Sequence, residues 1–341
     1  MKYLLILSFC CFLFSTQAQL KPDFFPEDVV AETLNPRCYC KPGVKNKSRS
    51  KGIVLSYGLL NNGSFEADDE PLTGPASQYN AWHNLNIKVK VPLINKEKLK
   101  VLLGYSYYSD IINFSFLGPD YTETLTNLND QALKSNSFGI YMTRSLNEKN
   151  YIGGRFRISS NGNYGGWMHF EGRTNIYKFL GVYGIKPNDN LEWGFGINIT
   201  HGFRGTFAIP LFIYNRTFNE HWGIEMALPG FVNMRYNVNE ANILLAGVEY
   251  GSKSYRLDVN NNTAESFDYA YNHSEITFSV RLEHRFAPWI WGNARIGYQT
   301  NFTNEFESRS ENTQTFELDP SSGAFFKVGL FLSPPDKFLE R

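Results

Sequence analysis

The sequence predicts an all-β fold, a single transmembrane antiparallel up-and-down β-barrel of about fourteen strands. Three observations predict it: a short apolar leader, an alternation of apolar and polar residues through most of the 341-residue chain, and short polar turns that interleave with longer polar connections. Alternation with a period of two is the pattern of a strand with one apolar and one polar face. Short turns at one end and longer loops at the other are typical of outer-membrane barrels.

Residues 1–18 have the features of a cleavable signal peptide. Lys2 supplies the positive start, an apolar core covers residues 4–14, and Thr16-Gln17-Ala18 is a small-residue cleavage site near Ala18. The apolar core is too short to span a bilayer, and no later run reaches the roughly 18 apolar residues that a membrane helix needs. We therefore expect secretion and a place in the outer membrane of a Gram-negative bacterium.

Residues 19–50 are expected to form a flexible periplasmic leader, because they hold four prolines and the start of a run of basic residues. The barrel is expected over residues 51–333, followed by a C-terminal tail at 334–341. Cys38 and Cys40 are separated by one residue, a spacing that strains a disulfide, and no histidine nearby completes a zinc site. Two interpretations of this pair stay open, an incidental occurrence and one labile disulfide.

The alternation defines the strands one by one. The predicted segments are 52–60, 78–91, 99–114, 135–146, 151–160, 170–185, 191–202, 206–218, 222–228, 231–237, 242–258, 273–286, 290–302 and 323–332. Their number is even, which leaves both chain ends in the periplasm. Twelve strands are an alternative, because the segments that flank Pro229-Gly230 are short. The longer outer loops are expected at 61–77, 115–134, 161–169, 259–272 and 304–321.

One stretch resembles a known family. The residues that carry the resemblance are Pro210, Trp222-Gly223, Leu228-Pro229, Arg235-Tyr236, Gly247 and Gly251…Tyr255. They resemble the signature of a bacterial outer-membrane β-barrel family of undefined function, most strongly over residues 191–257. The resemblance implies the fold and the location, and it brings no catalytic residues. One departure is the end of the chain, where residues 333–341 follow the last strand and leave Phe331 or Phe338 as the terminal aromatic.

If the apolar faces meet lipid, the polar faces line the lumen. On this assignment the odd-numbered residues 207–213 face the membrane. The charged residues expected to face the lumen are Lys88, Lys90, Arg155, Arg157, Arg216, Glu225, Arg235, Glu249, Lys253, Arg281, Glu283, Arg285 and Arg295. Two interpretations stay open. Cross-strand pairing along Arg216–Glu225–Arg235–Glu249 would fill the interior, whereas a surplus of basic residues would favour anions in a water-filled lumen.

Catalytic and metal-binding motifs are weak in this chain. His273 and Ser274 are adjacent in a predicted strand, so they point to opposite faces and cannot form a nucleophile–base pair alone. The other histidines lack metal-ligand spacing, and the acidic segment 66–70 lacks the alternating oxygens of a calcium loop. We predict no enzymatic activity, no metal and no cofactor. The zero net charge gives no indication of nucleic-acid binding.

The sequence therefore predicts a porin-like outer-membrane protein. We expect a passive channel or binding barrel for small polar, anionic or amphiphilic solutes, with outer-membrane lipid, the barrel-insertion machinery and a small solute as partners and the monomer as its state. One alternative is a structural or surface-interaction barrel with a plugged lumen. The other alternative is a lipid-modifying outer-membrane enzyme.

Overall fold

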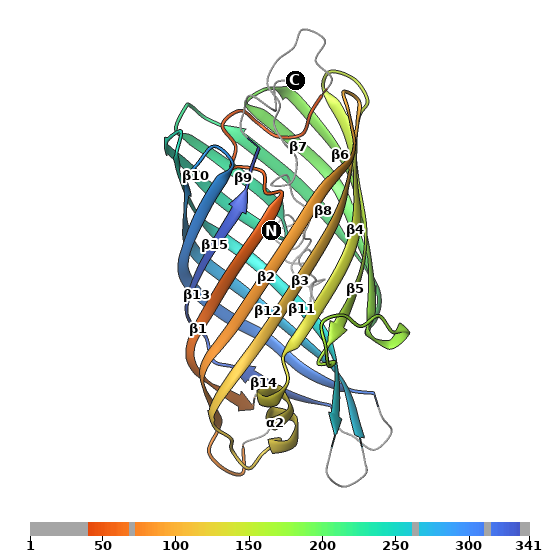
Figure 1. Ribbon diagram of the computed structural model, residues 1–341, viewed down its shortest axis with the longest axis vertical. Helices are drawn as coiled ribbons and strands as arrows, with labels where there is room; N and C mark the ends of the chain where they lie inside the picture. Colours follow the sequence, from red (N-terminus) through yellow and green to blue (C-terminus); the bar gives the residue numbers. More distant parts are fainter. Residues whose placement is uncertain (1–39, 68–71, 261–265, 310–314, 335–341) are drawn as a thin grey trace, which may run out of the picture.

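The computed structural model describes residues 40–67, 72–260, 266–309 and 315–334. The predicted signal peptide, Cys38, Phe338 and most of the acidic segment lie outside these residues. Within them the strands wind around one axis into a barrel (Figure 1). The barrel has a terminal end, at which the first strand begins and the last one ends, and an opposite loop end.

The strands follow the predicted order, with one helix and one 3-10 turn between them. They are β1 (Ile53–Ala67), β2 (Ser77–Lys96), β3 (Leu99–Phe116), α2 (Thr122–Asp130), β4 (Leu133–Ser145), β5 (Asn150–Gly162), η2 (Gly172–Thr174), β6 (Asn175–Asn188), β7 (Leu191–Gly202), β8 (Gly205–Thr217), β9 (Trp222–Leu228), β10 (Phe231–Asn239), β11 (Asn242–Asn260), β12 (Ser266–Arg285), β13 (Ile290–Ser308), β14 (Phe316–Pro320) and β15 (Gly323–Leu332). Nearly all neighbours in this order pair antiparallel.

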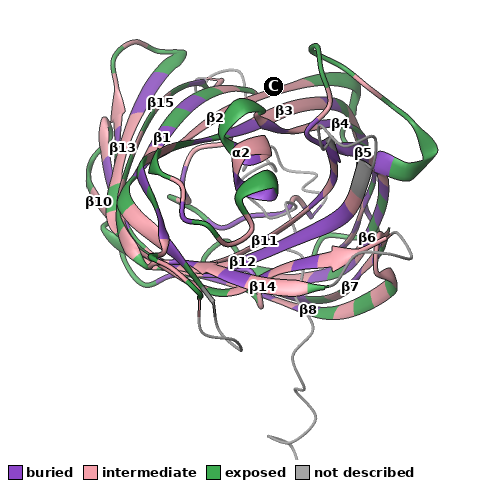
Figure 2. Cartoon of the chain, turned by 90° about the horizontal axis from the view of Figure 1, so that it is seen from below, coloured by how far each residue is buried: buried purple, intermediate pink, exposed green. Residues whose placement is uncertain are grey.

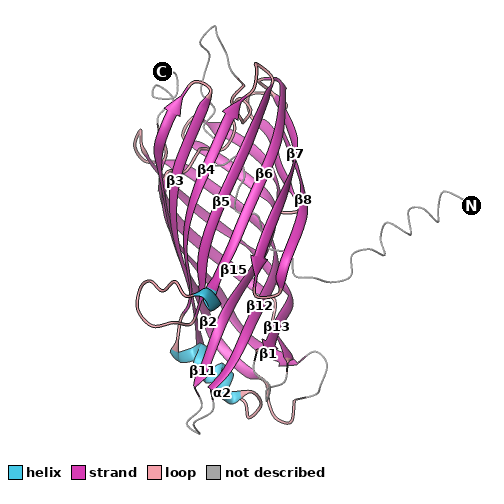
Figure 3. Ribbon diagram, turned by 90° about the vertical axis from the view of Figure 1, so that its right-hand side faces the viewer, coloured by secondary structure: helices cyan, strands magenta, loops and turns pink. Residues whose placement is uncertain are grey.

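The wall has fourteen strand positions. β14 and β15 share one of them, because both pair with β13 on one side and with β1 on the other. The β1–β15 pairing closes the barrel, which Figure 3 shows from the side. The predicted fold class and the count of fourteen are therefore confirmed, and the short segments beside Pro229-Gly230 are real strands.

Several strands run further toward the loop end than the sequence pattern predicts. β1 reaches Ala67, β12 begins at Ser266 and β13 continues to Ser308. The predicted loop at 115–134 contains α2. The extensions escaped prediction because Tyr269, Tyr271 and Phe306 turn aromatic side chains inward there, so the lumen side is apolar and the alternation is lost.

Apolar side chains cover the outside of the barrel. Ile296 is 62% exposed, Phe195 56% and Phe278 52%, and many other large apolar side chains share this face. A contiguous apolar surface of this kind is typical of a protein that contacts lipid or another apolar partner. No helix among the described residues is long and apolar enough to cross a membrane.

The barrel narrows toward the loop end. The hairpin of β9 and β10 is short, and beyond it β11 leans inward until Arg256 pairs with Gly162 of β5. Seen along the axis, β11 and β12 lie on the inner side of β7 and β8 (Figure 2). The interior is therefore wide near the terminal end and is enclosed by fewer strands near the loop end.

Candidate functional site

A segment before β1, residues 40–52, lines the inside of the terminal end, and we call it the strap. It follows the inner rim from the β4–β5 turn past β7, β9 and β12 to β15. The Cys40 amide donates to the Asn147 carbonyl at 2.9 Å, and the Gly52 amide donates to the Leu332 carbonyl at 2.9 Å. Val44 has no exposed surface. This part of the predicted flexible leader is thus folded against the barrel, because inward-facing carboxylates bind it.

Three glutamates on three strands hold the strap. Glu192 of β7 accepts the Gly43 amide at 2.8 Å, and Glu225 of β9 accepts the Ser48 amide at 2.8 Å and its hydroxyl at 2.5 Å. Glu283 of β12 pairs with Lys51 at 2.9 Å. All three glutamates are buried. Because buried carboxylates require donors, the strap and the wall stabilise one another.

The same carboxylates also bind the wall. Glu225 accepts Arg235 Nη1 of β10 at 2.9 Å, and Arg235 Nη2 donates to Thr217 Oγ1 at 3.0 Å. Tyr151 and Asn215 donate to the two oxygens of Glu192 at 2.7 and 2.6 Å. The terminal end is therefore a connected polar network rather than a row of separate pairs.

Burial changes the chemistry of the strap's first residues. It raises the pKa of the Cys40 thiol to about 11, and it lowers the pKa of Lys41, which also faces the like charge of Lys100. Cys40 is the one cysteine among the described residues, and its thiol is free of any disulfide there. The labile disulfide with Cys38 stays untested, because Cys38 lies outside those residues.

The strap leaves a cavity of about 390 Å³ at the terminal end. The side chains that line it include Arg49 of the strap, Arg285 of β12 and Trp291 of β13. The two guanidinium groups lie 5.2 and 6.0 Å from the centre of the indole ring. Such cation–π contacts hold Arg49 at the mouth of the barrel.

Basic side chains gather on the inner wall beyond the strap. Arg281 of β12, Arg295 of β13 and Lys327 of β15 are direct cross-strand neighbours, and so are Arg157 of β5 and Lys178 of β6. Glu249 pairs with Arg295 at 2.8 Å, and Glu283 lies 3.5 Å from Arg281. Like charges directly opposite one another destabilise a sheet, and the nearby glutamates offset part of this cost at Arg281 and Arg295.

An apolar patch lies beside the basic rows on the same inner face. Its six buried members come from β6, β8, β9 and β10: Leu180, Val182, Leu211, Ile213, Ala227 and Phe231. The sequence pattern placed residues 207–213 of β8 against lipid, whereas Leu211 and Ile213 are buried in the interior. The interior is therefore amphipathic, with one apolar and one basic sector.

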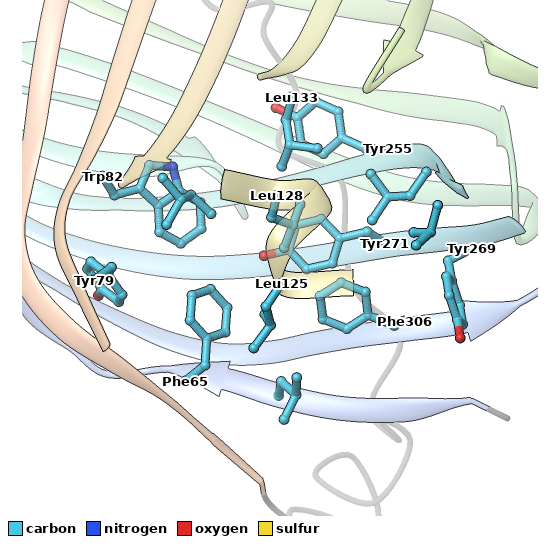
Figure 4. Close-up of a cluster of buried hydrophobic side chains, with 14 of the residues drawn as sticks. Phe65, Tyr79, Trp82, Leu125, Leu128, Leu133, Tyr255, Tyr269, Tyr271 and Phe306 are labelled. Atoms are coloured by element: carbon cyan, nitrogen blue, oxygen red, sulfur yellow. The ribbon is translucent and has the colours of Figure 1, made fainter. Parts of the chain in front are cut away.

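The loop end is filled by a second, larger apolar cluster. Leu125 and Leu128 of α2 contact a layer of aromatic side chains that the surrounding strands direct inward (Figure 4). Phe306 stacks against Tyr271 with ring centroids 4.5 Å apart. The helix and this aromatic layer together form a plug, which we call the loop-end plug.

A polar bridge crosses the interior on the side of the loop-end plug that faces the terminal end. Asp110 of β3 accepts Tyr108 at 2.7 Å, Tyr255 at 3.1 Å and Lys253 at 3.2 Å, and Lys253 also donates to the Tyr108 hydroxyl. Tyr255 and Lys253 belong to β11, far from β3 in strand order. The bridge therefore ties opposite sides of the barrel.

The histidine singled out in the sequence belongs to this region. His273 Nδ1 lies 2.8 Å from Asn304 Oδ1, and Nε2 lies 3.1 Å from Glu275 Oε2. Ser274 hydrogen-bonds Ser252 at 3.3 Å on the other face of the strand. His273 thus has structural partners, and Ser274 does not reach it. Among the described residues no group of three or more His, Cys, Asp or Glu side chains is arranged to hold a metal ion.

Most of the residues assigned to the lumen lie on the inner face, and one does not. Those on the inner face by strand register are Lys88, Lys90, Arg155, Arg157, Glu225, Arg235, Glu249, Lys253, Arg281, Glu283, Arg285 and Arg295. Arg216 is exposed on the outer face, where it contacts the Phe218 ring at 5.5 Å. Both faces of β8 carry apolar residues, so the alternation could not tell inside from outside.

The cross-strand pairing predicted along Arg216–Glu225–Arg235–Glu249 is found only in part. Glu225 and Arg235 pair as expected, but Glu249 pairs with Arg295 two strands away, and Arg216 has no part in it. The sequence did not indicate the strap contacts of Gly43, Ser48 and Lys51. Only the basic run at 41–51 and the inward glutamates could have signalled them, as opposite charges on separate segments.

Comparisons with solved structures return bacterial outer-membrane barrels. An outer membrane channel from Pseudomonas putida F1 is 9% identical with a TM-score of 0.43, covering 88% of this chain and 100% of that one. A Pseudomonas aeruginosa FadL homologue is 10% identical with a TM-score of 0.43, covering 82% and 89%. The KdgM porin in complex with disordered oligogalacturonate is 11% identical with a TM-score of 0.33, covering 82% and 98%. At such values these likenesses carry no inference about solutes.

Among curated proteins none matches this sequence. A family model does match, over residues 62–333, which is most of the barrel. The residues that resembled an outer-membrane family of undefined function, from Pro210 to Tyr255, fall inside this range. The chain therefore belongs to the family described as Domain of unknown function (DUF6268).

Proposed function

We propose that the protein is an outer-membrane barrel that binds small anionic or amphiphilic solutes in its interior and passes them through the terminal end. The terminal end would face the periplasm and the loop end the outside. The apolar outer belt supports the membrane location, since no soluble environment favours so many exposed aromatic and aliphatic side chains. A membrane fraction that lacks the protein, or a mature chain that stays soluble without detergent, would contradict it.

The basic rows of the inner wall carry the proposal. Arg281, Arg295 and Lys327 adjoin across three strand positions, and Arg157 adjoins Lys178. Like charges directly opposite one another repel, so an anion bound between them would stabilise these rows. Fixed positive charge on the wall of a pore favours anions over cations.

The test is the reversal potential of the refolded mature protein in a planar bilayer under a salt gradient. We expect anion selectivity, and we expect Arg157→Glu combined with Lys178→Glu to move the reversal potential toward the cation side. Arg216→Glu is the control, because it makes one such charge reversal on the outer face. An unchanged potential in the double variant, or an equal change in the control, would contradict the proposal.

A second candidate function is a surface-interaction barrel with a closed interior. The loop-end plug favours it, because α2 and the aromatic layer fill the loop end. The Asp110–Lys253 bridge then crosses the interior between the plug and the terminal end. A folded barrel that passes no current, even after the strap is released, would favour this alternative. The third candidate, a lipid-modifying enzyme, is not proposed, because His273 bonds to Asn304 and Glu275 and the adjacent Ser274 bonds to Ser252.

A further inference from the structure

We infer that the barrel wall has a side window on the loop-end side of the β9–β10 turn. Through this window an amphiphile with an apolar chain and one anionic group passes between the membrane and the interior. The inference rests on the proposed function and names its solute class and route. Four observations carry it: a short hairpin, its position in the outer belt, the interior surface behind it, and the contacts that bound the window.

The hairpin of β9 and β10 ends well before its neighbours. β8 extends from Gly205, but its pairing with β9 begins only at Phe212. β11 continues to Asn260, but its pairing with β10 ends at Glu249, after which the Tyr250 amide donates to the Gly230 carbonyl at 2.8 Å. Among the described residues, β8 at 205–211 therefore pairs with β7 alone, and its other edge faces a stretch of wall with no strand.

This stretch lies within the apolar outer belt. On one side Leu228 continues in register through Phe212 to Phe195. On the other side Val232 continues through Val248 to Phe278. Leu228, Phe195, Val248 and Phe278 are all exposed on the outer face. The turn thus lies at the level of side chains that contact lipid on both sides.

The interior behind the turn matches an amphiphile. Leu211 and Phe231 are the first members of the inner apolar patch at the rim of the window. Further in, Leu180 is the cross-strand neighbour of Arg155 and lies on the same strand face as Lys178, which adjoins Arg157. An apolar chain on the patch would place its anionic group beside these three basic side chains, where charge-assisted hydrogen bonds are strongest.

The window is closed on its loop-end side. Asn161 of β5 donates to the Ser254 carbonyl of β11 at 2.9 Å, next to the Arg256–Gly162 pairing. Arg204 at the β7–β8 tip pairs with Glu305 and Glu307 of β13. These contacts join β11 to β5 and β13 to the β7–β8 tip at the loop end. The stretch of wall without a strand is therefore confined to the region between these contacts and the β9–β10 turn.

The test uses an alkyl carboxylate that carries a photoreactive diazirine near its methyl end. It is added to the protein in lipid nanodiscs, and the labelled side chains are mapped by mass spectrometry. In the parent protein we expect adducts on the inner residues Leu211 and Phe231 and on the outer residues Val248 and Phe278. Labelling of the outer residues alone would overturn the window.

A variant that fills the window gives the decisive comparison. A pair of residues inserted after Leu228 and a matching pair before Phe231 would lengthen both strands into the gap. We expect inner labelling to fall by about tenfold or more while outer labelling stays constant. The control places the same insertion in the β10–β11 turn, between Glu240 and Ala241, and should label like the parent. Inner labelling that survives the β9–β10 insertion would overturn the route.

The charge requirement is tested with the alcohol of the same chain. We expect about tenfold less inner labelling by the alcohol than by the carboxylate, which corresponds to roughly 1.4 kcal/mol. Equal labelling would overturn the anionic part of the inference. Failure of this route is distinguishable from failure of the proposed function. Anion-selective current without inner labelling would leave the channel standing and remove the window, and inner labelling without current would do the reverse.

Discussion

Removing the Glu192 carboxylate should release the first half of the strap. Glu192 is fully buried and accepts three donors, of which only the Gly43 amide belongs to the strap. A hydrogen bond to a charged group contributes about 1.5–3 kcal/mol. In Glu192→Ala the strap loses that contribution, and since about 1.4 kcal/mol is a factor of ten, its open population should rise by about tenfold to a hundredfold.

Cys40 reports the opening directly. Its thiol is buried, and its pKa is raised from 9.0 to about 11, a difference of two pH units that leaves about a hundredfold less thiolate near neutral pH than in an accessible cysteine. Maleimide labelling of Cys40 in a Cys38→Ser background should therefore be slow in the parent. We expect Glu192→Ala to raise the labelling rate by the factor derived above, because labelling follows the open population when closing is fast.

The raised pKa of Cys40 also sets how the stability of the folded state changes with pH. The folded protein holds the Cys40 proton more tightly than the unfolded chain, so this group favours the folded state less as pH rises from 9 to 11.

Tyr151→Phe is the matched control for the labelling of Glu192→Ala, since it removes a donor to Glu192 that lies on the wall. If the labelling rate of Glu192→Ala equals that of the parent, or if Tyr151→Phe raises it equally, the carboxylate does not hold the strap.

Three further predictions concern the wall and the loop-end plug. Arg235→Gln should destabilise the folded barrel by about 3–5 kcal/mol in urea unfolding, because it removes the guanidinium group that pairs with the buried Glu225 carboxylate, whereas Arg216→Gln on the outer face should be neutral. Leu125→Ala should weaken the docking of α2 by about 2–5 kcal/mol and expose its segment to proteolysis, while Glu123→Ala should leave cleavage unchanged. Gly247→Ala should abolish the heat-modifiable gel shift of the folded barrel, because its Cβ would lie 2.1 Å from the Val232 carbonyl oxygen.

The alternation of side chains was sufficient for the fold. Strands such as β9 read clearly because Trp222, Ile224 and Met226 are large and apolar while Gly223 and Glu225 are small or charged. The signal fails where both faces carry apolar residues. In β8 the outer face holds Ala208, Pro210 and Phe212, and the inner face holds the apolar patch, so periodicity alone assigned the faces in reverse and placed Arg216 inside.

The candidate site could be predicted only in part. The basic side chains of the inner wall follow from parity along each strand, as in Arg155 and Arg157. Which of them adjoin does not follow, because a row such as Arg281–Arg295–Lys327 depends on the register of the β12–β13 hairpin and on the pairing of β13 with β15. The contacts of the strap are still less accessible, since Ser48 and Glu225 are separated by 177 residues and no local pattern connects them.

The distribution of the inner charges gives the strap a further role besides lining the terminal end. The inward glutamates Glu192, Glu225 and Glu283 all bond to it, and Glu225 also bonds to Arg235. They are thereby held near the terminal end, while the basic rows lie further in. A solute anion that reached the strap would meet carboxylates already bound by backbone amides and by Lys51, and these partners weaken the repulsion that bare carboxylates would exert. Release of the strap would expose the three glutamates at the terminal end. The exposed carboxylates should repel anions there, while the basic rows further in retain them.

The movement that releases the strap would then also change the ion selectivity of the barrel. Glu192→Ala removes one of the repelling charges together with the bond that holds the strap. We therefore expect the current through Glu192→Ala to be more anion-selective than the current through a variant that releases the strap and keeps all three glutamates, such as Ser48→Ala combined with Lys51→Ala. Equal selectivity in the two variants would mean that the exposed carboxylates do not act on passing ions.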